Sequence, residues 1–207
     1  MPKLPWTTNR FLKNNFEAQL RALQPPPPAG RLRVFAVDEA RFGLKTWHRR
    51  RWCPRGFRPP WIVQDRYQWL WLYAAVEPHT GESFCLYLPY LDTDCFQRFI
   101  DHLHQAYPDD FVVIVMDQAG SHLSEALIWP SQMEALCLPP YSPQLNPAER
   151  WFEAVRAVLA NRLFATLDEL AEALSQALKP YWEHIEKLAQ LTGFGWWKKA
   201  TDNIRTA

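Results

Sequence analysis

The sequence Leu138-Pro-Pro-Tyr-Ser-Pro-Gln-Leu-Asn-Pro-Ala-Glu-Arg-Trp-Phe152 marks the point at which a strand gives way to a helix. Its prolines stiffen a loop, Asn146 is a good N-cap, and Pro147 stands at the first helical position, where its missing N–H is tolerated. Glu149 then falls at the third position of the helix. The apolar residues that follow recur at helical spacing: Phe152, Val155, Val158, Leu159 and Leu163.

The carboxylate of Glu149 has two interpretations. In the first, it accepts a hydrogen bond from the backbone N–H of Asn146 and completes a capping box. In the second, it is an acidic ligand held at the rim of a sheet. The stretch taken alone favours the first interpretation, and two other parts of the sequence bear on the choice.

Two short apolar runs end in acidic residues. Residues 33–37 lead into the pair Asp38 and Glu39, and residues 111–116 lead into Asp117 and a glycine turn. Near-continuous apolar runs are typical of strands buried on both faces of an α/β sheet. Ligands of such sheets gather beyond the carboxyl ends of the strands.

Three carboxylates can therefore meet at one point. Asp38 and Asp117 each follow a strand, and Glu149 begins a helix. The usual reason to crowd three carboxylates is to hold hard divalent cations such as Mg²⁺. For either Asp alone, ordinary turn chemistry at a strand end is the alternative.

Three motifs together resemble the catalytic core of the DDE transposases of the mariner superfamily, with the bacterial insertion sequence 630 family as the nearest group. The motifs are Asp38-Glu39, Asp117 followed by His122, and Pro140-Tyr-Ser-Pro-Gln-Leu-Asn-Pro-Ala-Glu-Arg-Trp151. The last motif is long and specific, and the resemblance covers roughly residues 31–165.

The resemblance implies an α/β, ribonuclease-H-like fold, with a mixed five-stranded sheet flanked by helices. It implies a catalytic triad of Asp38, Asp117 and Glu149 that binds two Mg²⁺ or Mn²⁺ ions per active site. In that scheme Asp38 bridges both ions, Asp117 binds one and Glu149 binds the other. Asp117 and Glu149 are 32 positions apart, slightly closer than in eukaryotic mariner relatives.

Four further side chains are candidates near this site. Glu39 is expected on the opposite face of its strand because side chains alternate. Glu153 lies one helical turn beyond the glutamate of the motif but outside the matched loop. His122 either orders the leaving strand or a water, or simply begins a helix. Asn146 is expected to be a cap rather than a base reader.

Residues 41–64 are the most one-sided charged segment, since they contain basic residues and no Asp or Glu. A solvated basic loop is one interpretation. A DNA contact is the favoured one, because guanidinium groups neutralise phosphates and the interleaved tryptophans can stack. In relatives, a hairpin here touches DNA or the second protomer. The predicted DNA-binding residues are Arg41, Lys45, Arg49, Arg50, Arg51, Arg55 and Arg58.

The pattern along the chain divides it into three parts: a helix and Pro-rich linker over 1–30, a catalytic core over 31–165 with a basic hairpin insertion at 41–64, and C-terminal helices with an aromatic, basic tail over 166–207. The N-terminal helix is expected over 6–23. The expected strands are 32–37, 68–76, 83–88, 110–116 and 134–138. The other expected helices are 93–107, 122–129, one from 147, one opened by a capping box at 166–169 with Pro180 ending or kinking it, and 181–191.

The composition indicates a globular protein and bears on the cellular compartment in which it folds. The chain has 207 residues, 48% of them hydrophobic, and a net charge of +1, so it can bury a core and its overall charge says little about partners. The four cysteines form no C-x-x-C pair, which fits a reducing cytosol. The pair His102 and His104 has no further metal-type ligands nearby. No signal peptide or membrane span is expected, and the resemblance implies a bacterial, cytoplasmic and nucleoid-associated protein.

The leading hypothesis is a transposase catalytic domain that cuts and joins DNA. The resemblance implies transposon ends and target DNA as partners, a homodimer on DNA, and a separate helix-turn-helix protein for end recognition. One alternative is a ribonuclease-H-like nuclease without strand transfer. The other is an inactive DNA-binding remnant, against which the intact triad argues.

Overall fold

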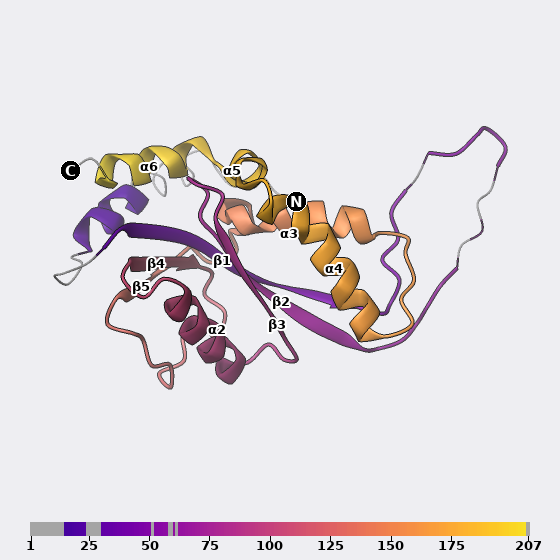
Figure 1. Ribbon diagram of the computed structural model, residues 1–207, viewed down its shortest axis with the longest axis horizontal. Helices are drawn as coiled ribbons and strands as arrows, with labels where there is room; N and C mark the ends of the chain where they lie inside the picture. The colour runs from indigo at the N-terminus through magenta and orange to yellow at the C-terminus, as the bar shows by residue number, and fades with distance from the viewer. Residues whose placement is uncertain (1–14, 24–29, 51, 58–59, 61, 206–207) are drawn as a thin grey trace.

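A mixed five-stranded sheet forms the centre of the molecule, in the order β3-β2-β1-β4-β5 (Figure 1). The computed structural model describes residues 15–23, 30–50, 52–57, 60 and 62–205. The predicted α/β class and all five predicted strands are confirmed, with ends shifted by at most one residue except in β1. The strands are β1 Leu32–Gly43, β2 Trp69–Val76, β3 Ser83–Leu88, β4 Phe111–Met116 and β5 Met133–Cys137.

Strand β1 is longer than its apolar run predicts, because it has different neighbours along its length. Its first half pairs in parallel with β4, from Leu32 to Ala36. Its second half pairs antiparallel with β2 and continues to Gly43. The sequence predicted that Asp38 follows the end of this strand, but Asp38 lies within it. Beyond Ala36 the β4 side of β1 is open, and the site is built in this opening.

The two faces of the sheet are covered by different helices (Figure 1). Helix α2, Thr93–Ala106, packs on one face, where Phe96 and Phe99 join a cluster with Phe35 and Val37 of β1. Its N-cap is Asp92, which accepts a hydrogen bond from Cys95 N at 2.8 Å. The remaining helices pack on the other face. They are α3 Pro147–Leu159, α4 Leu167–Trp182, α5 Ile185–Thr192 and α6 Gly195–Arg205.

The two chain-terminal regions share the second core with α3. The helical residues 15–22 place Phe16 in this cluster, where its ring lies 4.9 Å from that of the fully buried Trp197 of α6. Gly81, in the β2–β3 turn, has φ +81°, and a Cβ there would lie 1.8 Å from the carbonyl oxygen of Ile185. Glycine thus allows this turn to approach α5 closely. The predicted helix over 6–23 is described only from residue 15, and the predicted Pro-rich linker lies outside the described residues except for its last position.

The helix predicted over 122–129 is wrong. This segment contains turns, and the side chain of Gln97 on α2 binds its backbone. Gln97 Oε1 accepts from Ile128 N at 2.8 Å, and Gln97 Nε2 donates to Ile128 O at 2.9 Å. The tertiary contact with α2 replaces the helical hydrogen bonds that the sequence pattern favours.

Pro180 lies inside α4, which ends two residues later at Trp182. Half of the predicted capping box of α4 is present, since the side chain of Thr166 accepts from Glu169 N at 3.2 Å. Glu169 reaches back one residue further than expected, to Ala165 N at 2.7 Å. In the part of the chain that the structure describes, no helix is both long enough and apolar enough to cross a membrane.

Candidate metal-binding active site

Asp38 lies where β1 loses its β4 neighbour. The last parallel pair is Ala36 with Val115, and Asp38 is paired only with Ala74 of β2 on the other side. Because side chains alternate along a strand, Asp38 shares the α3 face with Ala36, whereas Glu39 shares the α2 face with Val37. The expectation that Asp38 and Glu39 point to opposite faces is confirmed.

Asn146 places the start of α3 beside Asp38. Its Oδ1 accepts from Ala148 N at 3.1 Å, which confirms the predicted cap. Its Nδ2 donates to the carbonyl of Val37 at 2.9 Å, one residue before Asp38. The side chain is buried and thus joins α3 directly to the open side of β1.

Glu149 does not cap its own helix in the way that the capping-box interpretation requires. The backbone N–H of Asn146 donates to the carbonyl of Pro143 at 2.9 Å, so that donor is already used. Glu149 is half-buried and lines the pocket in front of Asp38. Glu153, the other acidic candidate on α3, is exposed and does not line this pocket.

Asp117 follows β4 and its side chain is 59% exposed. Its Oδ1 accepts from Ala119 N at 3.0 Å, an ordinary Asx-type turn contact. The same oxygen lies 2.9 Å from Nδ1 of His122. His122 is buried and its Nε2 lies 3.0 Å from Glu39 Oε1. The sequence left the role of His122 open and gave Glu39 none, because the contact between them spans 83 residues.

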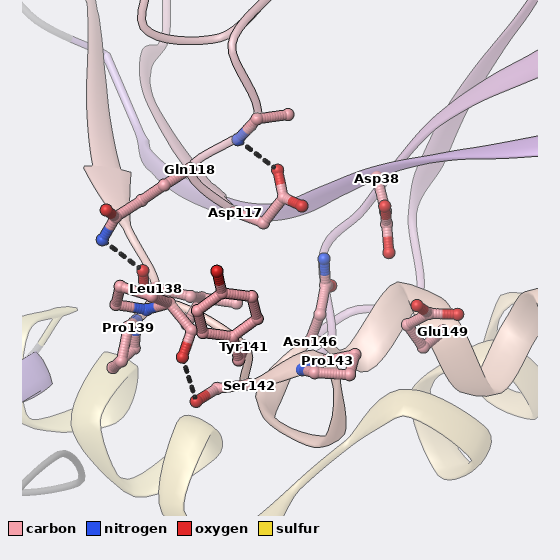
Figure 2. Close-up of a pocket in the computed structure, with 12 residues that line it drawn as sticks. Asp38, Asp117, Gln118, Leu138, Pro139, Tyr141, Ser142, Pro143, Asn146 and Glu149 are labelled. Atoms are coloured by element: carbon pink, nitrogen blue, oxygen red, sulfur yellow. Dashed lines mark hydrogen bonds between the residues drawn. The ribbon is translucent and has the colours of Figure 1, made fainter.

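One pocket of about 430 Å³ gathers the three carboxylates (Figure 2). Asp38 comes from the sheet, Asp117 from the loop after β4, and Glu149 from α3. The proline-rich loop forms the opposite wall. The lining residues are Asp38, Asp117, Gln118, Ala119, Leu138, Pro139, Pro140, Tyr141, Ser142, Pro143, Asn146 and Glu149.

The electrostatics of the pocket are unfavourable for three negative charges. Burial, followed by the charges of Glu149 and Glu39, raises the pKa of Asp38 to about 8. Burial also raises the pKa of Glu149. The pKa of Asp117 is instead lowered, first by its contact with His122. Burial would lower the pKa of His122, but its contacts with Asp117 and Glu39 outweigh burial and raise it to about 10.

The donor set fits hard divalent cations, since three carboxylates face one pocket and Asp38 is surrounded by other acids. The three carboxylates line a common space. Among the described residues, no group of three or more His, Cys, Asp or Glu side chains is arranged to hold one metal ion. Mutual repulsion between carboxylates opposes their closer approach.

The basic segment begins later than predicted, because Arg41 still belongs to β1. The described residues between Leu44 and Gln68 extend away from the body of the molecule (Figure 1). These described residues contain no strand, although the base of the segment is closed by two backbone hydrogen bonds, Leu44 N to Gln68 O and Thr46 N to Gln64 O. We call residues 44–68 the basic loop.

Asn161 anchors the basic loop just after the end of α3. It has φ +62°, which Asn tolerates better than most residues, and its backbone N–H donates to Trp47 O at 2.8 Å. Its side chain accepts from Arg49 N at 3.0 Å and donates to Arg49 O at 2.9 Å. These contacts fix one side of the loop beside the helix that carries Glu149.

The predicted DNA-binding residues lie in different surroundings. Arg41 stacks over Trp69, with 5.1 Å between the guanidinium carbon and the ring centroid. Lys45 pairs with Asp65 at 3.2 Å, just beyond the acid-free segment. Arg49, Arg50 and Arg55 are exposed on the basic loop, whereas Arg51 and Arg58 lie outside the described residues.

Three further arginines, which the sequence analysis did not single out, lie near the base of the basic loop. Arg66 and Arg156 line a groove of about 730 Å³ with Arg41 and Lys45, and Arg162 lines a smaller one nearby. Arg156 stacks near Trp47, 5.9 Å from the ring centroid. Arg156 and Arg162 lie far along the chain from the one-sided segment, so a search for local charge runs could not find them, and Arg66 follows Asp65, the acid that ends that segment.

Comparison with known proteins gives one family and several similar folds. Residues 33–171 match the family described as DDE superfamily endonuclease. The chain is 35% identical over 104 residues to Uncharacterized protein y4pE/y4sA of Sinorhizobium fredii (strain NBRC 101917 / NGR234), a match that covers 49% of this chain and 77% of the relative.

The fold resembles that of Mos1 transposase. A pre-cleavage Mos1 transpososome superposes with a TM-score of 0.63 at 17% identity, covering 98% of this chain and 64% of that one. The Mos1 strand transfer complex gives 0.60 at 17% identity, covering 98% and 63%. This chain thus spans less than two thirds of the length of the Mos1 chains. The sheet order and flanking helices are those of the ribonuclease-H-like fold.

Proposed function

The chain belongs to the DDE superfamily endonucleases, and on that premise we propose that it cleaves DNA strands and transfers them to new DNA through Asp38, Asp117 and Glu149. The observation that carries the proposal is the pocket itself. Carboxylates from β1, from the loop after β4 and from α3 line one space at the open side of the sheet. These carboxylates repel one another when ionised, and bound divalent cations would remove that repulsion.

In this proposal the carboxylates of Asp38, Asp117 and Glu149 would hold two Mg²⁺ or Mn²⁺ ions. Mos1 paired-end complexes with Mn and with Mg are among the structures of similar fold. When bound, such ions stabilise the attacking and leaving oxygens of a phosphodiester during in-line displacement. Asn146 keeps the start of α3 against β1, so Glu149 and Asp38 stay on the same side of the pocket.

The DNA is proposed to reach the pocket along the basic loop and the groove at its base. The guanidinium groups there would neutralise backbone phosphates and release counterions. The similar Mos1 structures include paired-end complexes, one of them with the left transposon end. We propose that this chain also binds DNA ends, and that it does so as a homodimer. The Sinorhizobium relative is a bacterial protein. We propose that this chain is likewise bacterial and belongs to the insertion sequence 630 group, with end recognition by a helix-turn-helix module and action at the nucleoid.

Two assays test the proposal. The first measures nicking of supercoiled plasmid in Mg²⁺ or Mn²⁺. The second measures joining of a labelled duplex with a free 3′-hydroxyl, taken from the DNA that flanks the gene, to the plasmid. Both activities should be lost in Asp38→Asn, Asp117→Asn and Glu149→Gln. Glu153→Gln, one turn along the same helix but outside the pocket, is the matched control and should retain both.

The outcomes separate the three hypotheses. Nicking and joining that both need the triad support a transposase. Nicking without joining supports a nuclease of the same fold. DNA binding without either reaction, and without a thermal shift on adding Mn²⁺, supports an inactive remnant and would refute the proposed activity.

A further inference from the structure

A row of three ionisable side chains crosses the sheet behind the pocket. Glu39 lies on the α2 face of β1, His122 lies next to it, and Asp117 lies at the pocket. The Glu39 and His122 side chains are 5% and 1% exposed, whereas that of Asp117 is 59% exposed. The row therefore begins in the core and ends at the candidate metal ligand.

His122 contacts Glu39 through one ring nitrogen and Asp117 through the other. Its Nε2 lies 3.0 and 3.2 Å from the two carboxylate oxygens of Glu39. Its Nδ1 lies 3.3 Å from the backbone carbonyl of Asp117 and 2.9 Å from Oδ1 of the same residue. Each ring nitrogen of His122 therefore faces oxygen atoms, those of Glu39 on one side and those of Asp117 on the other. The ring of Phe96 packs on it with 4.4 Å between centroids.

The two carboxylate oxygens of Asp117 have different contacts. Oδ1 contacts both His122 Nδ1 and the N–H of Ala119. The other oxygen has neither contact, and Figure 2 shows it directed toward the side of the pocket where Asp38 lies. A carboxylate on an exposed loop would otherwise sample several rotamers. The contacts on Oδ1 select the one in which the second oxygen faces the other acids.

We propose that Glu39 and His122 are positioning residues for Asp117, which fix its Oδ1 from behind and leave its second oxygen presented to the metal ions. This inference rests on the proposed function, because it takes Asp117 as a metal ligand. Partners that orient the ligands of a metal commonly change metal affinity or activity by about 10- to 100-fold when they are removed. Glu39 acts on Asp117 only through His122.

The role of Glu39 and His122 can be tested by removing both side chains at once. Removing His122 alone would leave the carboxylate of Glu39 buried without its partner, and the protein could fail to fold. The double variant Glu39→Met with His122→Leu removes both members of the pair together, so that neither is left buried without its partner. Replacing a buried ion pair by apolar groups of similar volume is often neutral for stability. Metal affinity then reports the orientation of Asp117.

The experiment measures Mn²⁺ binding to the full chain by isothermal titration calorimetry without DNA, together with the metal-free Tm. The double variant and the isosteric Glu39→Gln should bind Mn²⁺ about 10- to 100-fold more weakly than the parent. His102→Gln, an exposed histidine of α2, is the control and should bind like the parent. Asp117→Asn sets the affinity that remains without this ligand.

An unchanged Mn²⁺ affinity in the folded double variant, with loss of affinity in Asp117→Asn, would overturn the inference and leave the proposed function intact. If the double variant does not fold, the same comparison with Glu39→Gln decides the question. If Asp117→Asn itself binds Mn²⁺ like the parent, Asp117 is not a ligand, and the inference and the proposed triad both fail.

Discussion

Asn146 donates a hydrogen bond from its side-chain Nδ2 to the backbone carbonyl of Val37 at 2.9 Å. The contact spans 109 residues and joins the first turn of α3 to β1 just past the last β1–β4 pair. One side chain thus caps the helix that carries Glu149 and fixes it beside Asp38. The relative position of these two carboxylates depends on it.

Asn146→Ser should separate these two roles. Serine still caps α3 but cannot reach the Val37 carbonyl, so a buried acceptor loses its partner. We expect a loss of about 1–3 kcal/mol in the free energy of unfolding, measured with urea, and weaker Mn²⁺ binding. Thr166→Ala removes a cap that serves only α4 and should cost about 0.5–2 kcal/mol without changing Mn²⁺ binding. Equal Mn²⁺ affinities in both variants would refute the bridging role.

Asp38→Asn and Asp117→Asn should shift metal-free stability in opposite directions. Asp38 is buried among other acids, so removing its charge should raise the Tm of the metal-free protein. Asp117 pairs with His122, so the same change there should lower the Tm. From the sequence alone, Asp117→Asn would be expected to leave the metal-free fold equally stable or slightly more so, because crowded carboxylates repel one another.

Thermal unfolding with and without Mn²⁺ checks this prediction. The cation should stabilise the parent by binding only the folded state, and the shift should shrink in both variants. For a chain of this length, 1 kcal/mol corresponds to about 2–4 °C in Tm. A Tm that falls in Asp38→Asn would mean that the carboxylate of Asp38 has a stabilising partner.

Asn161→Gly should release the basic loop while keeping the backbone conformation. Glycine adopts φ +62° without strain but loses both side-chain hydrogen bonds to Arg49. We expect faster cleavage by trypsin at the arginines of the basic loop and weaker DNA binding. Asn161→Ala should release the loop equally and should also lower stability, by about 1 kcal/mol relative to glycine, because of backbone strain. Unchanged trypsin sensitivity in both variants would show that Asn161 is not the anchor.

Charge reversal at Arg50 should affect DNA binding more than reversal at Lys45. Lys45 already pairs with Asp65, whereas Arg50 has no ion-pair partner among the described residues. A cation that neutralises one phosphate contributes about 0.9 to the slope of log K against log salt. Arg50→Glu should reduce this slope by about one and Lys45→Glu by less. The slopes are measured by fluorescence anisotropy over a salt series, and equal slopes for parent and Arg50→Glu would place Arg50 away from phosphate.

Asp110→Asn should reduce stability at neutral pH but not in strong acid. Asp110 pairs with the buried side chain of Arg33, which also contacts Glu77 at 3.2 Å and Glu82 at 2.6 Å. Burial opposes ionisation of Asp110, but the contacts with Arg33 and the backbone of Arg31 outweigh it and lower its pKa.

The sign of the pH dependence follows from that lowered pKa. The ionised form favours the folded state, so its contribution is full above the ordinary value of 3.8 and is lost as the pH falls through the folded value. We expect Asp110→Asn to cost about 1–3 kcal/mol at pH 7 and progressively less below pH 4, measured by urea unfolding. Asp109→Asn, at the exposed neighbour, should follow the parent curve. A constant difference between Asp110→Asn and parent across the pH range would contradict the assignment.

Local chemistry accounts for what the sequence predicted well. The start of α3 follows from Asn146 and Pro147, because a cap and an N1 proline act on neighbouring backbone groups. The bounds of β3 and the opposite faces of Asp38 and Glu39 follow from turn residues and from alternation along a strand. For the same reason, the sequence alone brought Asp38, Asp117 and Glu149 to one edge of the sheet.

Contacts between distant segments decided the rest. Pairing with β2 carries β1 on to Gly43, so Asp38 lies inside a strand. Gln97 holds the segment after His122 in turns instead of a helix. The burial of His122 between Glu39 and Asp117 depends on β1 meeting the loop after β4, and no local pattern encodes such a meeting. The sequence therefore determined which side chains can bind a cation, and the tertiary structure determined how they are oriented, because orientation depends on partners that only folding brings together.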